Sequence, residues 1–276
     1  MPSHQAFQTS AASTSRATEP PNPRVQLKDL LSPLFEAAQD SSSLIASRHP
    51  FEVHGVAHEI PKFLLLGQRG GGKPIRIGVF AGFESTDADA IEALTYILLQ
   101  LKLSPGLTRD FALLAYPVVN VRGFGEDPVP LADFEARFAR DSADADVQFF
   151  KTQLRQWTFD GLISLRTDTA AKGFSASVRS EIIAHEVVEP ALAAAASALP
   201  LASKPVKVRA GDRYARTADY AHGRLSPPAD VRPYPFEIEL FTPRAWLTER
   251  TEAGLFVAIT EILRLYRGLI AHAQNL

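Results

Sequence analysis

Short continuous apolar runs alternate along this chain with longer segments in which apolar residues recur every three or four positions. The first pattern is typical of strands buried on both faces of a sheet, and the second of helices that pack against it. The alternation predicts an α/β fold with a mixed, mostly buried sheet and helices on both faces. The predicted strands cover 75–83, 111–121, 160–165 and 235–243, and the predicted helices cover 87–101, 144–156, 180–199 and 248–273.

The N-terminal part of the chain has a different composition. Residues 1–24 are rich in Ser, Thr, Ala and Pro and show no helical or strand period, which predicts a disordered tail. Residues 25–50 are predicted to be a helical segment, because leucines recur at helical spacing from Leu27 onward. A pair of strands is expected over 51–66, and one α/β domain over 51–276.

Composition and charge exclude several classes of protein. Hydrophobic residues make up 46% of the chain and charged residues 22%, as in folded globular proteins. The net charge of −2 creates no basic field that would favour nucleic acid or an anionic membrane. The absence of cysteine excludes disulfides, thiolate metal sites and a cysteine nucleophile. No apolar run has membrane-spanning length and no signal peptide is apparent, so we expect a cytoplasmic protein.

A glycine-rich segment matches most of a phosphate-binding loop, Gly67-x-x-x-x-Gly72-Lys73. That loop needs Ser or Thr after the lysine and a helix that begins there, whereas Pro74 and a predicted strand follow here. The segment is therefore predicted to be a hairpin turn.

The histidines form no recognisable metal-binding motif. His54 and His58 fall in a predicted strand, where positions i and i+4 lie about 13 Å apart. His185 has no second histidine at ligand spacing. A nucleophile elbow and a dinucleotide-binding glycine motif are also absent from the sequence.

Chemically distinctive residues follow the predicted strands in a particular order. Phe83-Glu84-Ser85-Thr86 follows the strand at 75–82, and the next strand ends at Asn120, before Arg122 and Gly123. Later segments are Asp133-Phe134-Glu135-Ala136-Arg137-Phe138, Arg166-Thr167-Asp168, Gly173-Phe174, and a late strand with Glu237 and Glu239. From about residue 51 onward, this order and spacing resembles the zinc carboxypeptidase family. The resemblance is greatest to short bacterial members near the succinylglutamate desuccinylase/aspartoacylase group.

The resemblance implies a carboxypeptidase-like domain over 51–276, with a zinc site at the ends of its strands. The family's three zinc ligands, a His, a Glu and a second His, fall on Phe83, Thr86 and Arg166. The pair that holds the substrate carboxylate falls on Glu135 and Ala136. The general base falls on Glu239, with Glu237 as the alternative.

The residues at these positions differ from the family's in ways that argue against zinc. Phe83 has no ligating atom, Thr86 is a poor ligand, and Arg166 carries a permanent positive charge. We therefore expect no metal or other cofactor, and no hydrolytic activity. The residual groove, with Glu84, Asn120, Arg122 and Asp168 as candidates, would bind a small carboxylate, a peptide or a protein.

Two other functions stay open at this point. One is an active carboxypeptidase or N-acyl amino acid deacylase with non-standard ligands. The other is a non-catalytic interaction protein, in which a polar excursion over 203–233 supplies contacts. Its candidate anchors are Tyr214, Tyr220, Arg213, Arg216 and Arg224.

Carboxylates near the expected site suggest two further arrangements. An oxygen-rich magnesium or calcium site could use Glu84, Asp87, Asp89, Asp168 and Glu239. However, the aspartates at 87 and 89 also suit the N-terminus of the following helix, and an arginine would lie among the ligands. We instead predict a desolvated ion pair between Arg166 and one of Glu239, Glu84 or Asp168.

Overall fold

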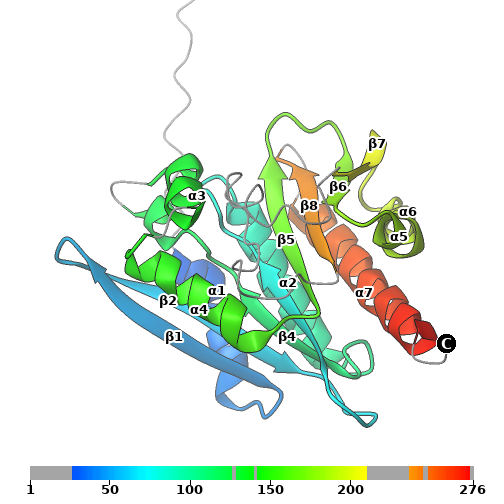
Figure 1. The fold of residues 1–276 in the computed structure, drawn as a ribbon, viewed down its shortest axis with the longest axis horizontal. Helices are drawn as coiled ribbons and strands as arrows, with labels where there is room; N and C mark the ends of the chain where they lie inside the picture. The colour runs from blue at the N-terminus through cyan, green and yellow to red at the C-terminus, as the bar shows by residue number, and fades with distance from the viewer. Residues whose placement is uncertain (1–26, 126–128, 140–141, 210–235, 245–247, 274–276) are drawn as a thin grey trace, which may run out of the picture.

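A computed structural model describes residues 27–125, 129–139, 142–209, 236–244 and 248–273 (Figure 1). The predicted tail over 1–24 lies outside the described residues. So do the five candidate anchors of the 203–233 excursion, Tyr214, Tyr220, Arg213, Arg216 and Arg224.

One mixed sheet of eight strands forms the centre of the described structure, in the order β1-β2-β4-β3-β5-β8-β6-β7 (Figure 1). The strands from β4 through β3 and β5 to β8 are parallel, as are β6 and β7, and the other pairs are antiparallel. The mixed sheet confirms the predicted α/β class. The strands are β1 (Leu44–Val53), β2 (Val56–Leu66), β3 (Ile75–Phe80), β4 (Phe111–Tyr116), β5 (Gly161–Asp168), β6 (Phe174–Val178), β7 (Leu201–Val208) and β8 (Glu237–Pro243).

Helices cover both faces of the sheet, as predicted (Figure 1). One face packs against α1 (Leu27–Gln39), α2 (Ala88–Leu103), α6 (Glu189–Ala195) and α7 (Thr248–Ala273). The other packs against α4 (Ala145–Trp157), with α3 (Leu131–Ala139) beside it. A 3-10 turn (Val121–Phe124) follows β4, and α5 (Glu181–Ile183) and a π-helical turn (Ala184–Val188) precede α6.

Each face of the sheet has its own hydrophobic core. The first is mainly aliphatic, whereas the second is rich in aromatic rings, such as Phe80 stacked on Tyr116 at 5.1 Å between centroids. All six residues of β4 are buried, which explains the continuous apolar sequence of this central strand. Burial on both faces therefore fixes which strands occupy the middle of the sheet.

Two sequence predictions for the N-terminal part of the described chain are wrong. The helix expected over 25–50 ends at Gln39, and β1 begins at Leu44 and pairs with β2 along its whole length. The turn between the two strands lies at His54 and Gly55, which have φ angles of 51° and 79°. The sequence segment FEVHGVAHEI is thus the hairpin tip rather than one strand, because these two residues adopt the left-handed backbone of a tight turn.

Pro61 lies inside β2 and does not interrupt it. Pairing of β2 with β4 covers only Phe63–Leu66, so no hydrogen bond with β4 requires an N–H at Pro61. The strand therefore continues through the proline.

The glycine-rich segment between β2 and β3 is not a hairpin turn. β4 lies between these two strands in the sheet, so residues 67–74 cross the end of β4. A strand, and no helix, follows the segment, as its sequence predicted.

The excursion predicted over 203–233 begins with regular structure. Residues up to 208 belong to β7, an edge strand parallel to β6. Its alternating lysines and its proline made the strand look like a loop in the sequence, and such residues are common on edge strands.

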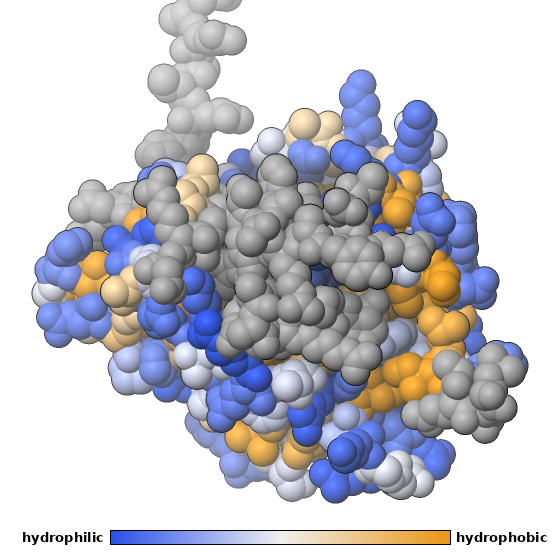
Figure 2. Space-filling model, viewed as in Figure 1, coloured by the Kyte–Doolittle hydropathy of each residue, from blue (hydrophilic) through white to orange (hydrophobic). Residues whose placement is uncertain are grey.

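The surface carries hydrophilic and hydrophobic residues in different places. Hydrophilic residues predominate on the visible face, and hydrophobic ones gather mainly on the side where α7 lies (Figure 2). Within the described ranges, none of the helices combines the length and apolar character needed to cross a bilayer.

Gly161 provides a test of the packing between β5 and α7. A Cβ at this position would lie 2.3 Å from the ring of Phe236, which itself packs edge-on against Tyr266 of α7. Gly161→Ala is expected to lower the free energy of unfolding by about 2 kcal/mol, measured by urea denaturation. Gly106→Ala is the matched control, because a Cβ there meets nothing within 4 Å. Equal stability of both variants would contradict this packing.

Candidate functional site

The candidate site lies where the parallel strands β3, β4 and β5 end. Phe83 follows β3, Asn120 follows β4, and Arg166 lies near the end of β5. In open α/β sheets, ligands bind outside the carboxyl ends of parallel strands. The topology therefore brings these sequence-predicted residues to the edge of the sheet where a ligand site is expected.

The three residues that the resemblance placed at zinc-ligand positions, Phe83, Thr86 and Arg166, meet around Glu84. The Nη2 atom of Arg166 lies 3.6 Å from Oε1 of Glu84, and the hydroxyl of Thr86 donates to Oε2 at 3.3 Å. The guanidinium of Arg166 also lies over the ring of Phe83, at 4.6 Å from its centroid. Of the three partners predicted for Arg166, the structure selects Glu84.

This ion pair is less buried than predicted. The side chain of Arg166 is 17% exposed and that of Glu84 is 43% exposed. Water therefore screens the pair, and its contribution to stability is modest. Contact with the Phe83 ring adds a cation–π attraction, which is stronger where the cation is partly desolvated.

The carboxylate of Asp87 connects the backbone segments that carry the site residues. Its Oδ2 accepts hydrogen bonds from the backbone N–H groups of Phe83 and Glu84, at 3.0 and 3.1 Å, and its Oδ1 accepts one from Thr167 at 3.1 Å. Burial raises the pKa of Asp87, opposed by the charge of Arg166 and by these three donors. The carboxylate thus joins the end of β3 to the end of β5.

The sequence had suggested Asp87 only as a helix-favouring residue or a cation ligand. It stands at the N-cap of α2, yet its side chain caps no helical N–H. The signal that could have identified its role is a carboxylate placed just after a buried strand and a glycine-containing turn. Because loop amides at that point have no strand partner, they need an acceptor.

Asn120 fixes the loop after β4 against the same site. Its Nδ2 donates to the carbonyls of Phe83 and Val129, and its Oδ1 accepts from the N–H of Gly123. Asn120 is fully buried, so these bonds satisfy a side chain that cannot reach water. Its function here is structural.

The two candidate general bases occupy a charged part of the sheet. The Oε2 of Glu239 lies 3.4 Å from Nη2 of Arg209, and the Oε2 of Glu237 lies 3.2 Å from Nη2 of Arg179. Glu239 was a predicted partner of Arg166, but Arg209 takes that place. Neither arginine was predicted from the sequence to be a partner. Arg209 in particular follows a strand that had been assigned to a loop.

The remaining candidate residues do not converge on Arg166. Asp168 accepts a hydrogen bond from the N–H of Ala170 at 2.8 Å, as in an ordinary turn. Arg122 is partly buried on the 3-10 turn, and Ala136 is partly buried on α3. The side chain of Glu135 lies outside the description.

Arg137 of α3 has a structural role that was not predicted from the sequence. Its Nη1 contacts Asp144 and Asp146 at 2.9 and 3.0 Å, and so ties α3 to the start of α4. The available signal was its place next to Ala136, where the resemblance had suggested the arginine that holds a substrate carboxylate.

The site residues do not fit a zinc ion. Phe83 and Arg166 offer no lone pair, and Thr86 offers only a hydroxyl, which is already used on Glu84. Among the described residues, no group of three or more His, Asp or Glu side chains could hold a metal ion. The oxygen-rich cation site is likewise not assembled, because Asp87 is committed to backbone amides and Glu239 faces Arg209.

Arg166→Ala tests how the site is held together. The variant loses the pair with Glu84 and the contact with Phe83, so its free energy of unfolding is expected to fall by about 1 to 2 kcal/mol. Urea denaturation measures the change. Arg264→Ala is the control, because Arg264 is 59% exposed in its pair with Glu261 and should change stability by less than about 0.5 kcal/mol. Unchanged stability of Arg166→Ala would show that the pair is unimportant.

Comparison with known proteins identifies the fold. No protein-family model matches the chain, and no curated sequence matches it significantly. The solved structure of a metallo-carboxypeptidase from Burkholderia cenocepacia matches with a TM-score of 0.62 and 11% identity, covering 88% of this chain and 68% of that one.

Two further structures agree with this match. A provisionally assigned metallopeptidase from Shewanella baltica gives a TM-score of 0.55 at 13% identity, covering 87% of this chain and 89% of that one. A metallo-carboxypeptidase from Pseudomonas aeruginosa gives 0.55 at 14% identity, covering 86% and 68%. The described chain therefore has the fold of the metallo-carboxypeptidases.

Proposed function

We propose that this protein is a non-hydrolytic binding protein with a carboxypeptidase-like fold, which holds a ligand carboxylate at Arg166. The observation that carries the proposal is the guanidinium of Arg166 near the end of β5, beside Phe83 and Glu84, where the sequence resemblance had placed a zinc ligand. Its charge is permanent, and within the described residues its side chain makes no hydrogen bond. It pairs with Glu84 at 3.6 Å, and its charge also acts on the carboxylate of Asp87. A planar guanidinium with unused donors is well suited to a carboxylate.

Electrostatics opposes a metal at this position. A divalent cation beside a guanidinium would experience a repulsion on the order of several kcal/mol, even at the effective dielectric constant of a protein surface. Neither the ring of Phe83 nor the hydroxyl of Thr86 offers a compensating strong ligand. The same charge that excludes a cation attracts an anion.

Hydrolysis in this fold would need a group that activates water, and the residues here do not assemble one. Glu239 is the former base position, and its carboxylate faces Arg209 at 3.4 Å. A carboxylate alone supplies neither a Lewis acid for the carbonyl nor an acidified water. Binding without cleavage is therefore the function that this set of side chains supports best.

The ligand class follows from the accessibility of the pair. Glu84 is 43% exposed, so a competing carboxylate can approach the guanidinium without displacing a buried group. A small organic acid and the C-terminal end of a peptide present the same chemistry.

The test combines metal content and binding. After incubation with zinc and desalting, elemental mass spectrometry is expected to find well below one zinc per chain. The zinc-treated protein should bind N-acetyl-Ala-Ala without cleaving it, and Arg166→Met should weaken binding by about tenfold. The C-terminally amidated peptide is the matched control ligand. It should bind the wild type no more tightly than N-acetyl-Ala-Ala binds Arg166→Met.

Two results would contradict the proposal. Stoichiometric zinc together with release of the C-terminal alanine would show an active metallohydrolase. Equal binding of the free and amidated peptides would show that no carboxylate is recognised.

A further inference from the structure

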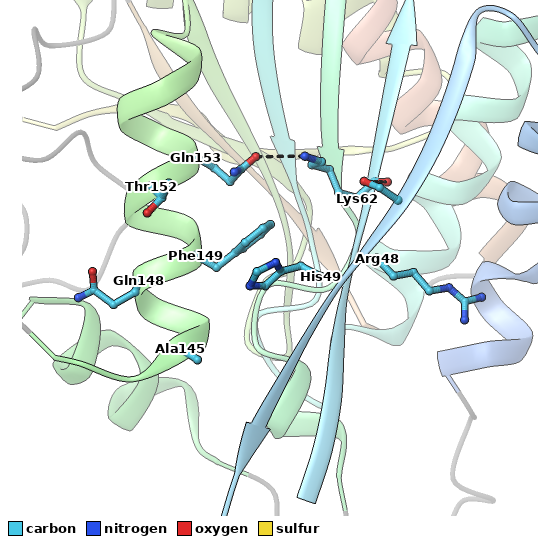
Figure 3. Close-up of a pocket in the computed structure, with 9 residues that line it drawn as sticks. Arg48, His49, Lys62, Ala145, Gln148, Phe149, Thr152 and Gln153 are labelled. Carbon is cyan, nitrogen blue, oxygen red and sulfur yellow. Dashed lines mark hydrogen bonds between the residues drawn. The ribbon is translucent and has the colours of Figure 1, made fainter.

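A cavity lies between the β1–β2 hairpin and α4 (Figure 3). Its volume is about 470 Å³, within the range of small-molecule sites. None of Phe83, Thr86 or Arg166 lines it. The side chains that matter for its chemistry are His49, Lys62, Phe149 and Gln153.

The strand period explains which side chains face this cavity. Ser47 pairs with Lys62 and His49 with Ile60, so these residues share the face of the hairpin that looks toward α4. Arg48 lies on the opposite face, where its guanidinium packs over Phe35 of α1 at 4.1 Å (Figure 3). Lys62 is therefore the cationic side chain that the hairpin directs toward α4, together with the titratable ring of His49.

Around the side chain of Gln153, which lines the cavity, hydrogen-bond donors outnumber acceptors. Its Oε1 accepts from the hydroxyl of Tyr116 at 3.0 Å, from Nε1 of Trp157 at 3.1 Å and from Nζ of Lys62 at 3.3 Å. An amide oxygen has two lone pairs, so three donors compete for it. The ammonium has the longest of the three bonds and two further N–H groups to satisfy.

The positive charge of Lys62 is also not balanced by a carboxylate in the cavity lining. Lys62 pairs with no carboxylate among the described residues, and α4 contributes no charged side chain to the lining. Arg48 is neutralised by Glu59 at 3.3 Å, while the acidic residues at the start of α4, Asp144 and Asp146, are held by Arg137. An anion in the cavity would supply the missing acceptor and the missing charge.

We propose that this cavity is a binding site for a small organic anion, whose carboxylate or phosphate contacts Lys62 beside the stacked rings of His49 and Phe149. The two rings lie 4.4 Å apart between centroids, at an angle of 23°, so they stack on each other beside the cation. Aromatic rings next to a cation suit a ligand that joins an anionic group to an apolar body. The proposal is independent of carboxylate binding at Arg166.

Proton binding should be coupled to occupancy. Burial, and then the charge of Lys62, lowers the pKa of His49 in the free protein, and burial lowers that of Lys62. A nearby anion favours both charged forms and raises both pKa values. Binding should therefore strengthen as the pH falls through the ordinary histidine range, and protons should be taken up.

Isothermal titration calorimetry with inorganic phosphate and with benzoate tests the site. Both titrations use the Arg166→Met variant, so that binding at the other site does not contribute. One saturable site is expected for at least one probe, with tighter binding at about pH 6 than at about pH 8. Binding of phosphate alone or of benzoate alone identifies the preferred anion, and either supports the proposal.

Substitutions at the wall locate the binding. Lys62→Met, which keeps the apolar stem, should weaken binding by at least about tenfold. Lys73→Met is the control, because this exposed lysine lies in the glycine-rich segment and does not line the cavity. Gln153→Glu keeps the shape and places a carboxylate on Lys62, so it should abolish anion binding and raise the melting temperature.

The result that overturns the proposal is the absence of saturable binding of both probes at millimolar concentration. Binding that Lys62→Met and Gln153→Glu both leave unchanged would also overturn it. Gln153→Glu is expected to be more stable than the wild type. Its binding measurement therefore remains informative even if Lys62→Met folds poorly.

Discussion

The buried carboxylate of Asp87 is the interaction on which the candidate site depends. It accepts backbone hydrogen bonds from Phe83 and Glu84 after β3 and from Thr167 in β5, and so fixes two strand ends side by side. Leaving those amides without an acceptor would cost about 1 to 3 kcal/mol for each buried group. Through this connection Arg166 lies against the Phe83 ring and beside Glu84.

The face of the sheet that α3 and α4 partly cover carries different side chains in its two halves. Over β2, β4 and β3 it carries aromatic rings, covered by α3 and α4. Over β8 and β6 it carries the glutamate–arginine pairs of Glu237 with Arg179 and Glu239 with Arg209. Both pairs include a buried glutamate, and buried carboxylates require such partners. In this half of the sheet, arginine side chains therefore neutralise the carboxylates of β8.

Apolar periodicity predicted the α/β class, the buried strands β3, β4, β5 and β8 and the helices α2, α4 and α7, because burial on one or both faces dictates those patterns. It failed for β1, whose open edge tolerates Arg48, His49 and Pro50, and for the lysine-bearing edge strand β7. The order of segments predicted which residues meet at Glu84. The partner of Glu239 and the anchoring by Asp87 depend on three-dimensional pairing across distant strands, which no local pattern encodes.

We propose that Phe83, Thr86 and Arg166 occupy the three ligand positions of a lost zinc site. The most direct test is to measure the zinc content of the triple variant Phe83→His, Thr86→Glu and Arg166→His beside that of the wild type, by elemental mass spectrometry after incubation with zinc. Our account predicts about one zinc per chain in the variant and well below one in the wild type, because the substitutions supply two imidazoles and a carboxylate at one point. A folded variant without zinc, or a wild type with stoichiometric zinc, would contradict it.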